Sequence, residues 1–207
     1  KETNIDTTSL EVLIKYGEVI KDVDLNIRDK KDYKMPKFII DNLEIIDKAL
    51  ENVTVADPSV GSGAFPLGML NEIVKARSIL TEYILMHEFF RLEKEDKKSE
   101  FFDLDDKLRK KRSLYKLKLD TIENSLFGVD IEPSAVDIAK LRLWLSIVVD
   151  SPDDDIQPLP NLDFNLMVGN SLLDEFEGIK LFDEKLLVKK LKIVNTVKNV
   201  DKFDYHQ

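Results

Sequence analysis

The stretch that decides the fold is ADPSVGSGAF, residues 56–65. A short run rich in β-branched residues, NVTV at 52–55, precedes it, and a pattern typical of a helix begins near Pro66. A strand, a glycine-containing turn and a helix in this order are typical of sites that bind nucleotide-like ligands. Because glycine lacks a Cβ atom, Gly61 and Gly63 allow the backbone to turn sharply and to approach a ligand closely.

Two more pairs of a strand and a helix follow this one. The predicted strands cover 52–57, 125–130 and 162–170. The helices after them begin near Pro66 and cover 131–149 and 183–199. This alternation predicts an α/β fold with a parallel sheet and right-handed crossovers. Ligands of such sheets bind at the carboxyl ends of the strands, which here carry Asp57, Asp130 and Asn170.

The helix predicted at 131–149 has apolar residues on most of its sides. We therefore expect it to be buried between the sheet and another layer. Between the first two strands lies a long charged excursion, residues 76–119, which contains neither glycine nor proline. We expect two helices there, with a polar joint near residues 94–100.

The residues before the glycine loop also have helical patterns. Residues 10–20 could form one helix, and residues 35–52 predict a single helix with Pro36 in its first turn. One apolar stripe runs along the second of these at spacings of three and four: Phe38, Ile39, Leu43, Ile46 and Leu50. The predicted parts of the chain are an N-terminal helical segment, 1–51, and a ligand-binding domain, 52–207, with a helical insertion at about 77–124.

Composition excludes several classes of protein. Of the 207 residues 43% are hydrophobic, which is enough for a sizeable core. The absence of cysteine excludes disulfides and cysteine-bound zinc, and only two histidines, His87 and His206, argue against a histidine metal site. No apolar run approaches the roughly 20 residues of a membrane span, and no signal peptide is visible, so we expect a cytoplasmic protein. A chain that begins at Lys1 rather than Met predicts a piece of a longer polypeptide.

The charge of the chain bears on nucleic-acid binding. A net charge of −9 argues against a chain that grips nucleic acid by itself, because phosphate contacts need clustered lysines and arginines. The basic run at 107–112 could contact DNA. We favour a solvated helix face that is balanced by the acidic residues before it.

The glycine loop lacks the features of a phosphate site. A dinucleotide-binding turn has the pattern G-x-G-x-x-G, but Ala64, Phe65 and Pro66 follow the second glycine here; the G-K-[ST] of a P-loop is also absent. Asp57 would repel a pyrophosphate and could attract an ammonium group. A ligand with an adenosine part, an amino acid part and no phosphate fits better, and S-adenosyl-L-methionine is such a ligand. The alternative for Asp57 and Pro58 is a turn in which the carboxylate accepts hydrogen bonds from loop amides.

The other two strand ends also allow two interpretations. Asp130 could accept both hydroxyls of a ribose, with Ile131 against the adenine face. Alternatively, Asp130 or Glu132 caps the following helix, and the two interpretations are compatible because Glu132 is the better-placed cap. The Asn170 amide could bind an adenine edge, or Gly169 and Asn170 could simply form a turn. The three strand ends together favour a cofactor site.

Three quoted stretches follow one another in the chain: DPSVGSGAF at 57–65, SLFGVDIEPSAVDIAKLRLWLSIVVD at 125–150 and PLPNLDFNLMVGNSLL at 158–173. In this order they resemble motifs I, II and III of the adenine-specific DNA methyltransferases of restriction–modification systems. The second stretch is similar to motif II of the large single-chain, type IIG-like members. The resemblance covers roughly residues 53–173.

This resemblance implies a bacterial or archaeal protein with a Rossmann-like methyltransferase fold that binds S-adenosylmethionine. The intact enzymes methylate the N6 amine of an adenine flipped out of double-stranded DNA. The motifs imply Asp57, Pro58, Gly61 and Gly63 around the methionine part, Phe65 beside it, Asp130 at the ribose, Ile131 at the adenine ring and Asn170, where many relatives have Asp, at the adenine edge. No metal ligand is implied in this segment.

The chain also departs from the family. It contains no Pro-Pro pair, so the catalytic Asn/Asp-Pro-Pro-aromatic motif is absent. We therefore expect this chain to be inactive by itself and double-stranded DNA to be bound largely by regions outside it. Met35-Pro36 stands where family members usually carry Thr-Pro. Two alternatives stay open: an RNA or protein methyltransferase of the same fold, and a non-catalytic S-adenosylmethionine-binding interaction module.

Overall fold

The structure is a computed structural model, and it describes residues 6–27, 32–150, 161–173, 175–176 and 179–180. The helix predicted at 183–199 lies outside the described residues.

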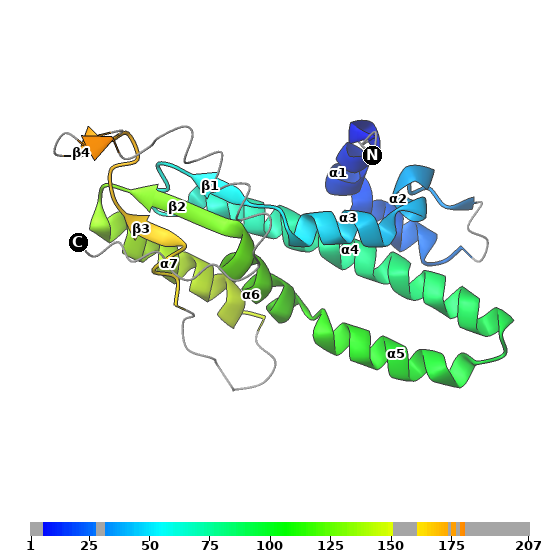
Figure 1. Cartoon of the computed structure of the whole chain (residues 1–207). Coiled ribbons are helices and arrows are strands. Elements are labelled where there is room, and N and C mark those ends of the chain that lie inside the picture. The colour runs from blue at the N-terminus through cyan, green and yellow to red at the C-terminus, as the bar shows by residue number, and fades with distance from the viewer. Residues whose placement is uncertain (1–5, 28–31, 151–160, 174, 177–178, 181–207) are drawn as a thin grey trace.

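A three-stranded parallel sheet lies toward one end of the fold, at the left of Figure 1. Its strands, in the order in which they pair, are β1 (Val55–Asp57), β2 (Leu126–Asp130) and β3 (Leu166–Val168). Asp57 pairs with Gly128, and Asp130 with Val168, so the three strands end at the same edge. A separate antiparallel pair follows, β4 (Glu175–Phe176) and β5 (Ile179–Lys180). The predicted parallel sheet is confirmed within a mostly helical chain, while the Rossmann-like assignment stays a prediction.

The third strand is shorter than the predicted 162–170. It covers only residues 166–168, because the residues before it form a turn in which the Asn165 and Leu166 amides donate to the Leu162 carbonyl. The buried Asn165 side chain donates to three carbonyls, those of Ile122, Glu123 and Leu126. This amide therefore joins the turn to the last turn of α6 and to the start of β2.

Three helices connect β1 to β2. They are α4 (Ala64–Lys94), α5 (Lys98–Lys111) and α6 (Leu114–Ser125). The predicted joint near 94–100 is confirmed, with Asp96 in a left-handed conformation. The prediction of two separate helices over 76–119 is wrong, because α4 continues unbroken from the glycine loop and Ser113 begins another helix by capping the Lys116 amide. Figure 1 shows α4 extending away from the sheet and α5 returning beside it.

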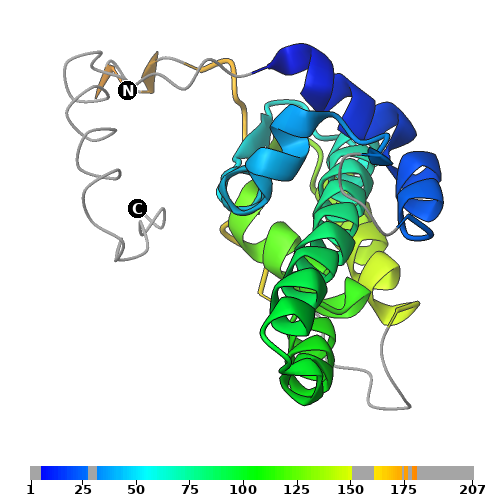
Figure 2. The same cartoon turned by 90° about the vertical axis from the view of Figure 1, so that its right-hand side faces the viewer.

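An N-terminal layer packs on α4. It contains α1 (Thr7–Asp24), α2 (Lys37–Asp41) and α3 (Leu43–Glu51), and Figure 2 shows these helices gathered around one side of α4. The prediction of one helix over 35–52 is wrong, because Asn42 leaves the helical conformation and its side chain donates to the Phe38 carbonyl. Pro36 lies at the N-cap of α2 rather than in its first turn. The predicted apolar stripe still points inward, with Ile39 fully buried.

Two hydrophobic clusters share α4. Leu70 and Val74 of α4 belong to a cluster around the sheet, together with residues of α6, α7 and the strands. Ile79 and Tyr83, farther along α4, belong to a cluster with the N-terminal layer. The division of the chain at residue 51 stays a prediction.

The helix after β2, α7 (Pro133–Val148), corrects another expectation. Its buried side is one stripe, Val136, Ala139, Leu143 and Ile147. The expectation that this helix is buried between the sheet and another layer is wrong for the described residues, since Ile138, Leu141 and Leu145 are each about half exposed. Among the described elements, the sheet, α4 and α6 make the main contacts with α7.

Buried ion pairs join the N-terminal layer to the connecting helices. The Asp47 carboxylate on α3 accepts hydrogen bonds from Arg77 of α4 at 3.2 Å and from Arg112 at 2.7 Å. Arg77 also bonds Asp120 and Glu51. Within the basic run, Arg109 and Lys110 pair with Asp105 and Asp106, as predicted. Arg112, its last residue, is instead mostly buried against Asp47 and not solvated.

Candidate functional site

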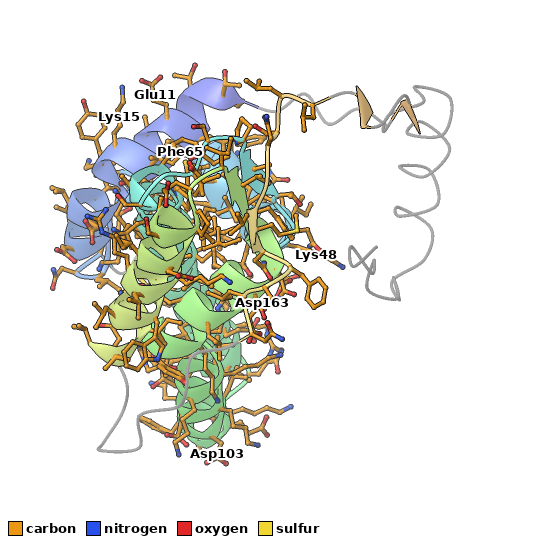
Figure 3. All side chains as sticks on the ribbon, turned by 90° about the vertical axis from the view of Figure 1, so that its left-hand side faces the viewer. Glu11, Lys15, Lys48, Phe65, Asp103 and Asp163 are labelled. Carbon is orange, nitrogen blue, oxygen red and sulfur yellow. The ribbon has the colours of Figure 1, made fainter. Side chains whose placement is uncertain are left out.

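The three strand ends predicted to form a site lie side by side. β1 and β3 flank β2, and the Gly169 amide donates to the Asp130 carbonyl at 2.9 Å. Asp57, Asp130 and Asn170 therefore stand at one edge of the sheet, where ligands of parallel sheets bind. Figure 3 views the molecule from this edge, with Phe65 labelled at the start of α4.

Asp130 is the central group of this edge. One carboxylate oxygen accepts a hydrogen bond from the Gly61 amide at 2.7 Å, and the other accepts one from the Glu132 amide at 3.0 Å. These backbone donors, Glu132 first and Gly61 second, hold the pKa of the Asp130 carboxyl below its usual value. Each ionised oxygen has more than one acceptor position, so Asp130 can still accept hydroxyl groups.

The helix-cap interpretation is confirmed for Glu132. Glu132 is the N-cap of α7, and its carboxylate accepts hydrogen bonds from the Ser134 hydroxyl at 2.8 Å and the Ser134 amide at 3.4 Å. Glu132 therefore satisfies the start of the helix, while Asp130 holds the turn before it. Ile131 lies between Asp130 and Glu132 in the chain and is 71% exposed.

The glycine loop has the backbone conformation that its glycines predict. Gly61 and Gly63 have positive φ angles of 50° and 81°, a region that other residues rarely adopt. A Cβ atom at Gly63 would lie 2.9 Å from the Ala139 Cβ atom of α7. A Cβ atom at Gly61 would have no atom within 4 Å, so the backbone there faces open space that a ligand can reach.

Gly128, within β2, was not among the predicted site residues. A Cβ atom there would lie 2.7 Å from the side chain of Val60, and the Val60 amide donates to the Val129 carbonyl at 3.0 Å. The loop therefore lies directly over β2. A glycine inside a strand often indicates a close approach of another backbone, and this signal could have identified Gly128.

Asp57 and Pro58 form the predicted turn. The Asp57 carboxylate accepts a hydrogen bond from the Ser59 amide through one oxygen, Oδ1. The carbonyl of Pro58 accepts a hydrogen bond from the Ser171 hydroxyl at 2.6 Å. Among the described residues the second Asp57 oxygen bonds no donor, so one oxygen makes the turn and the other stays available.

Asn170 also forms a turn. Its side-chain oxygen accepts a hydrogen bond from the Leu172 amide, and the residue is exposed. The Asn170 side-chain nitrogen bonds no described residue, so it can still donate to a ligand. Ser171, which follows, was not predicted; its contact with Pro58 spans 113 residues, so no local pattern could have indicated it.

Two apolar side chains remain uncovered at this edge. Phe65 in the first turn of α4 is 54% exposed, and Ile131 is more exposed still. Large apolar side chains beside unpaired polar groups are typical of the lining of a small-molecule site. A cavity of about 860 Å³ lies elsewhere, between the end of α1 and the paired helices α4 and α5, so it is separate from the strand ends.

The described residues contain no group of three or more His, Cys, Asp or Glu side chains that could hold a metal ion. Among the described helices, none is both long and apolar enough to cross a membrane.

Comparisons with known proteins bear on the family that the chain resembles. The family model of the Eco57I restriction-modification methylase matches residues 124–206, which include β2, α7 and β3. The chain is also 34% identical over 128 residues to a provisionally assigned type II restriction enzyme and methyltransferase of Methanocaldococcus jannaschii. The resemblance to restriction–modification methyltransferases is confirmed.

The aligned part is 60% of this chain and spans 9% of the length of that archaeal relative. A comparison with solved structures gave no match.

Proposed function

We propose that this chain is the S-adenosylmethionine-binding part of a DNA adenine-N6 methyltransferase of a restriction–modification system. The observation that carries the proposal is the Asp130 carboxylate, which holds the Gly61 amide of the glycine loop and keeps acceptor positions free at the sheet edge. The match to a restriction-modification methylase family supports the reaction class.

The residues at the strand ends fit the parts of this cofactor. Asp130 would accept the ribose hydroxyls, Ile131 would lie against the adenine ring, and Asn170 would donate to the adenine edge. The free oxygen of Asp57 would attract the ammonium group of the methionine part, close to Gly61 and Phe65. When bound, the cofactor supplies a methyl group on a sulfonium centre.

Charge favours this ligand over a nucleotide with phosphates. The loop is flanked by two carboxylates, Asp57 and Asp130, and a phosphate between them would be repelled. S-adenosylmethionine carries two positive groups, the ammonium and the sulfonium, and one carboxylate. The loop should therefore discriminate strongly against ATP although both ligands contain adenosine.

The acceptor that we propose is a flipped adenine of double-stranded DNA. The chain contains no Asn/Asp-Pro-Pro-aromatic motif, which would hold the target amine. We therefore propose that these residues bind the methyl donor, and that DNA binding and methyl transfer need further residues. Locating this protein in the cytoplasm, as the sequence predicts, is consistent with such a substrate.

Calorimetric titration tests the donor site. We expect S-adenosylmethionine and S-adenosylhomocysteine to bind the 207-residue chain, and ATP at the same concentrations not to bind. Asp163→Asn is a control, because this carboxylate is exposed and bonds Lys140 away from the loop. Equal binding of ATP, or no binding of either adenosyl ligand at millimolar concentration, would contradict the proposal.

The acceptor needs its own assay. A polypeptide that carries these residues together with an Asn/Asp-Pro-Pro-aromatic motif should transfer tritiated methyl groups from S-adenosylmethionine to double-stranded DNA. Preferential transfer to RNA or protein would favour an RNA or protein methyltransferase of the same fold. Donor binding with no transfer to any of the three would favour an interaction module.

A further inference from the structure

Arg142 differs from the other described arginines in the groups that it bonds. Among the described residues, Arg77, Arg91, Arg109 and Arg112 all form ion pairs with carboxylates. Arg142 on α7 forms none and donates instead to Ser62 of the glycine loop. Its Nη1 atom lies 2.9 Å from the Ser62 hydroxyl and 3.2 Å from the Ser62 carbonyl oxygen.

Ser62 lies between the two left-handed glycines, at the start of α4. Arg142 therefore bonds the loop where its backbone is least restrained by side chains. Ala139, one helical turn before Arg142, packs against Gly63 of the same loop. Residues three apart lie on one face of a helix, so α7 contacts the loop at two adjacent points.

Two other elements also hold the loop. Asp130 of β2 accepts the Gly61 amide, and Ser171 beyond β3 donates to the Pro58 carbonyl. The loop is thus fixed by side chains from three places in the chain. Within this set, Arg142 lies in the third turn of α7, beyond Ala139, and not at the end of the helix where Asp130 and Glu132 stand.

We propose that Arg142 is a positioning residue for the methyl-donor loop. It holds the Ser62 carbonyl and hydroxyl so that the Gly61 backbone keeps the conformation that binds the cofactor. This inference rests on the proposed donor site. A loop with two glycines samples many conformations when it is released, and ligand affinity falls by the fraction of molecules in the competent one.

Calorimetry with S-adenosylhomocysteine measures this effect. We expect Arg142→Ala to weaken binding about tenfold, as loss of charge-assisted hydrogen bonds to a loop predicts. Arg142→Lys retains one charged donor and should recover part of the affinity. Lys140→Ala is the matched control, because Lys140 lies on the same helix and bonds the exposed Asp163 instead of the loop; its affinity should equal that of the unchanged chain.

Amide hydrogen exchange separates positioning from general stability. In Arg142→Ala we expect faster exchange at Gly61 and Gly63, and unchanged exchange at Leu143 and Ile147 in the buried stripe of α7. Faster exchange throughout α7, with a lowered melting temperature, would show that Arg142 serves only the stability of the helix and would overturn the inference.

Binding data distinguish the two proposals. If the unchanged chain binds and Arg142→Ala binds equally well, the positioning role is overturned and the donor site stands. If the unchanged chain binds no adenosyl ligand, the donor site and the positioning role are both overturned.

Discussion

Asp47 and Asp130 are two carboxylates of one chain whose pKa values are both lowered, for different reasons. Burial alone would raise the pKa of Asp47, but hydrogen bonds from Arg112 and the charges of Arg112 and Arg77 outweigh it. The pKa of Asp130 is lowered by two backbone amides, those of Glu132 and Gly61. Only 7% of Asp47 is exposed, whereas Asp130 is half-buried at an open edge.

The difference separates a carboxylate whose oxygens are occupied by partners inside the fold from one that can still accept hydrogen bonds from a ligand. Asp47 lies between guanidinium groups that occupy its oxygens from inside the fold. Asp130 is held by the backbone amides of Gly61 and Glu132, and its oxygens keep acceptor positions toward solvent. A lowered pKa therefore indicates a functional site only when the groups that cause it leave room for a ligand.

The largest effect that we expect is on the stability of the fold and concerns Asp47. Asp47→Ala should lower the free energy of unfolding by about 3 kcal/mol, because it leaves the buried Arg77 with fewer partners. Urea unfolding measures this change. Asp41→Ala, at an exposed position of the neighbouring α2, should change it by less than about 0.5 kcal/mol. Equal effects of the two substitutions would mean that the buried ion pairs contribute little.

The next effect concerns the loop that Asp130 holds. Gly63→Ala should lower the free energy of unfolding by about 2 kcal/mol, because alanine is strained at positive φ and its Cβ atom would meet Ala139. Gly68→Ala is a matched control with the opposite sign. Gly68 is exposed within α4 with open space around it, so alanine there should stabilise the fold by about 0.5–1 kcal/mol.

Chemical denaturation of both variants measures these changes. If Gly63→Ala were as stable as the unchanged chain, the close contact between the loop and α7 would not exist in solution.

The role that we propose for Asp130 is tested by ligand affinity rather than by stability. Asp130→Asn should weaken S-adenosylmethionine binding about 10- to 100-fold, because an amide replaces one acceptor of the ribose hydroxyls and disturbs the Gly61 contact. Asp47→Asn should leave the affinity of the folded chain unchanged. Calorimetric titration checks both, and a loss of affinity in Asp47→Asn alone would reverse the two roles.

The smallest effect is a dependence of stability on pH. The ordinary pKa of an Asp carboxyl is 3.8, and the folded value of Asp47 lies below it. As the pH falls, the unfolded chain takes up the proton first, so the stabilisation by Asp47 is present above about pH 4 and is lost as the pH falls through its lowered pKa.

The slope of unfolding free energy against pH below pH 4 should therefore be smaller in Asp47→Asn than in the unchanged chain. An unchanged slope would show that Asp47 does not titrate differently in the two states.

Sequence patterns predicted the parallel strands, the glycine turn and the cap at Glu132, because these depend on residues that are close in the chain. They did not predict the break at Asn42, where a side-chain amide competes with the helical backbone, or the exposed side of α7. Apolar residues around a helix indicate that another element could pack on that side. They do not indicate whether any described element does so.

By itself the sequence determined which groups stand at the sheet edge: Asp57, the two loop glycines, Asp130 and Asn170. It did so because strand period, turn residues and caps are local properties of the chain. Only the tertiary structure decided what holds those groups in place. Arg142 reaches Ser62 across 80 residues, and Ser171 reaches Pro58 across 113, and such hydrogen bonds exist only after packing has brought distant elements together.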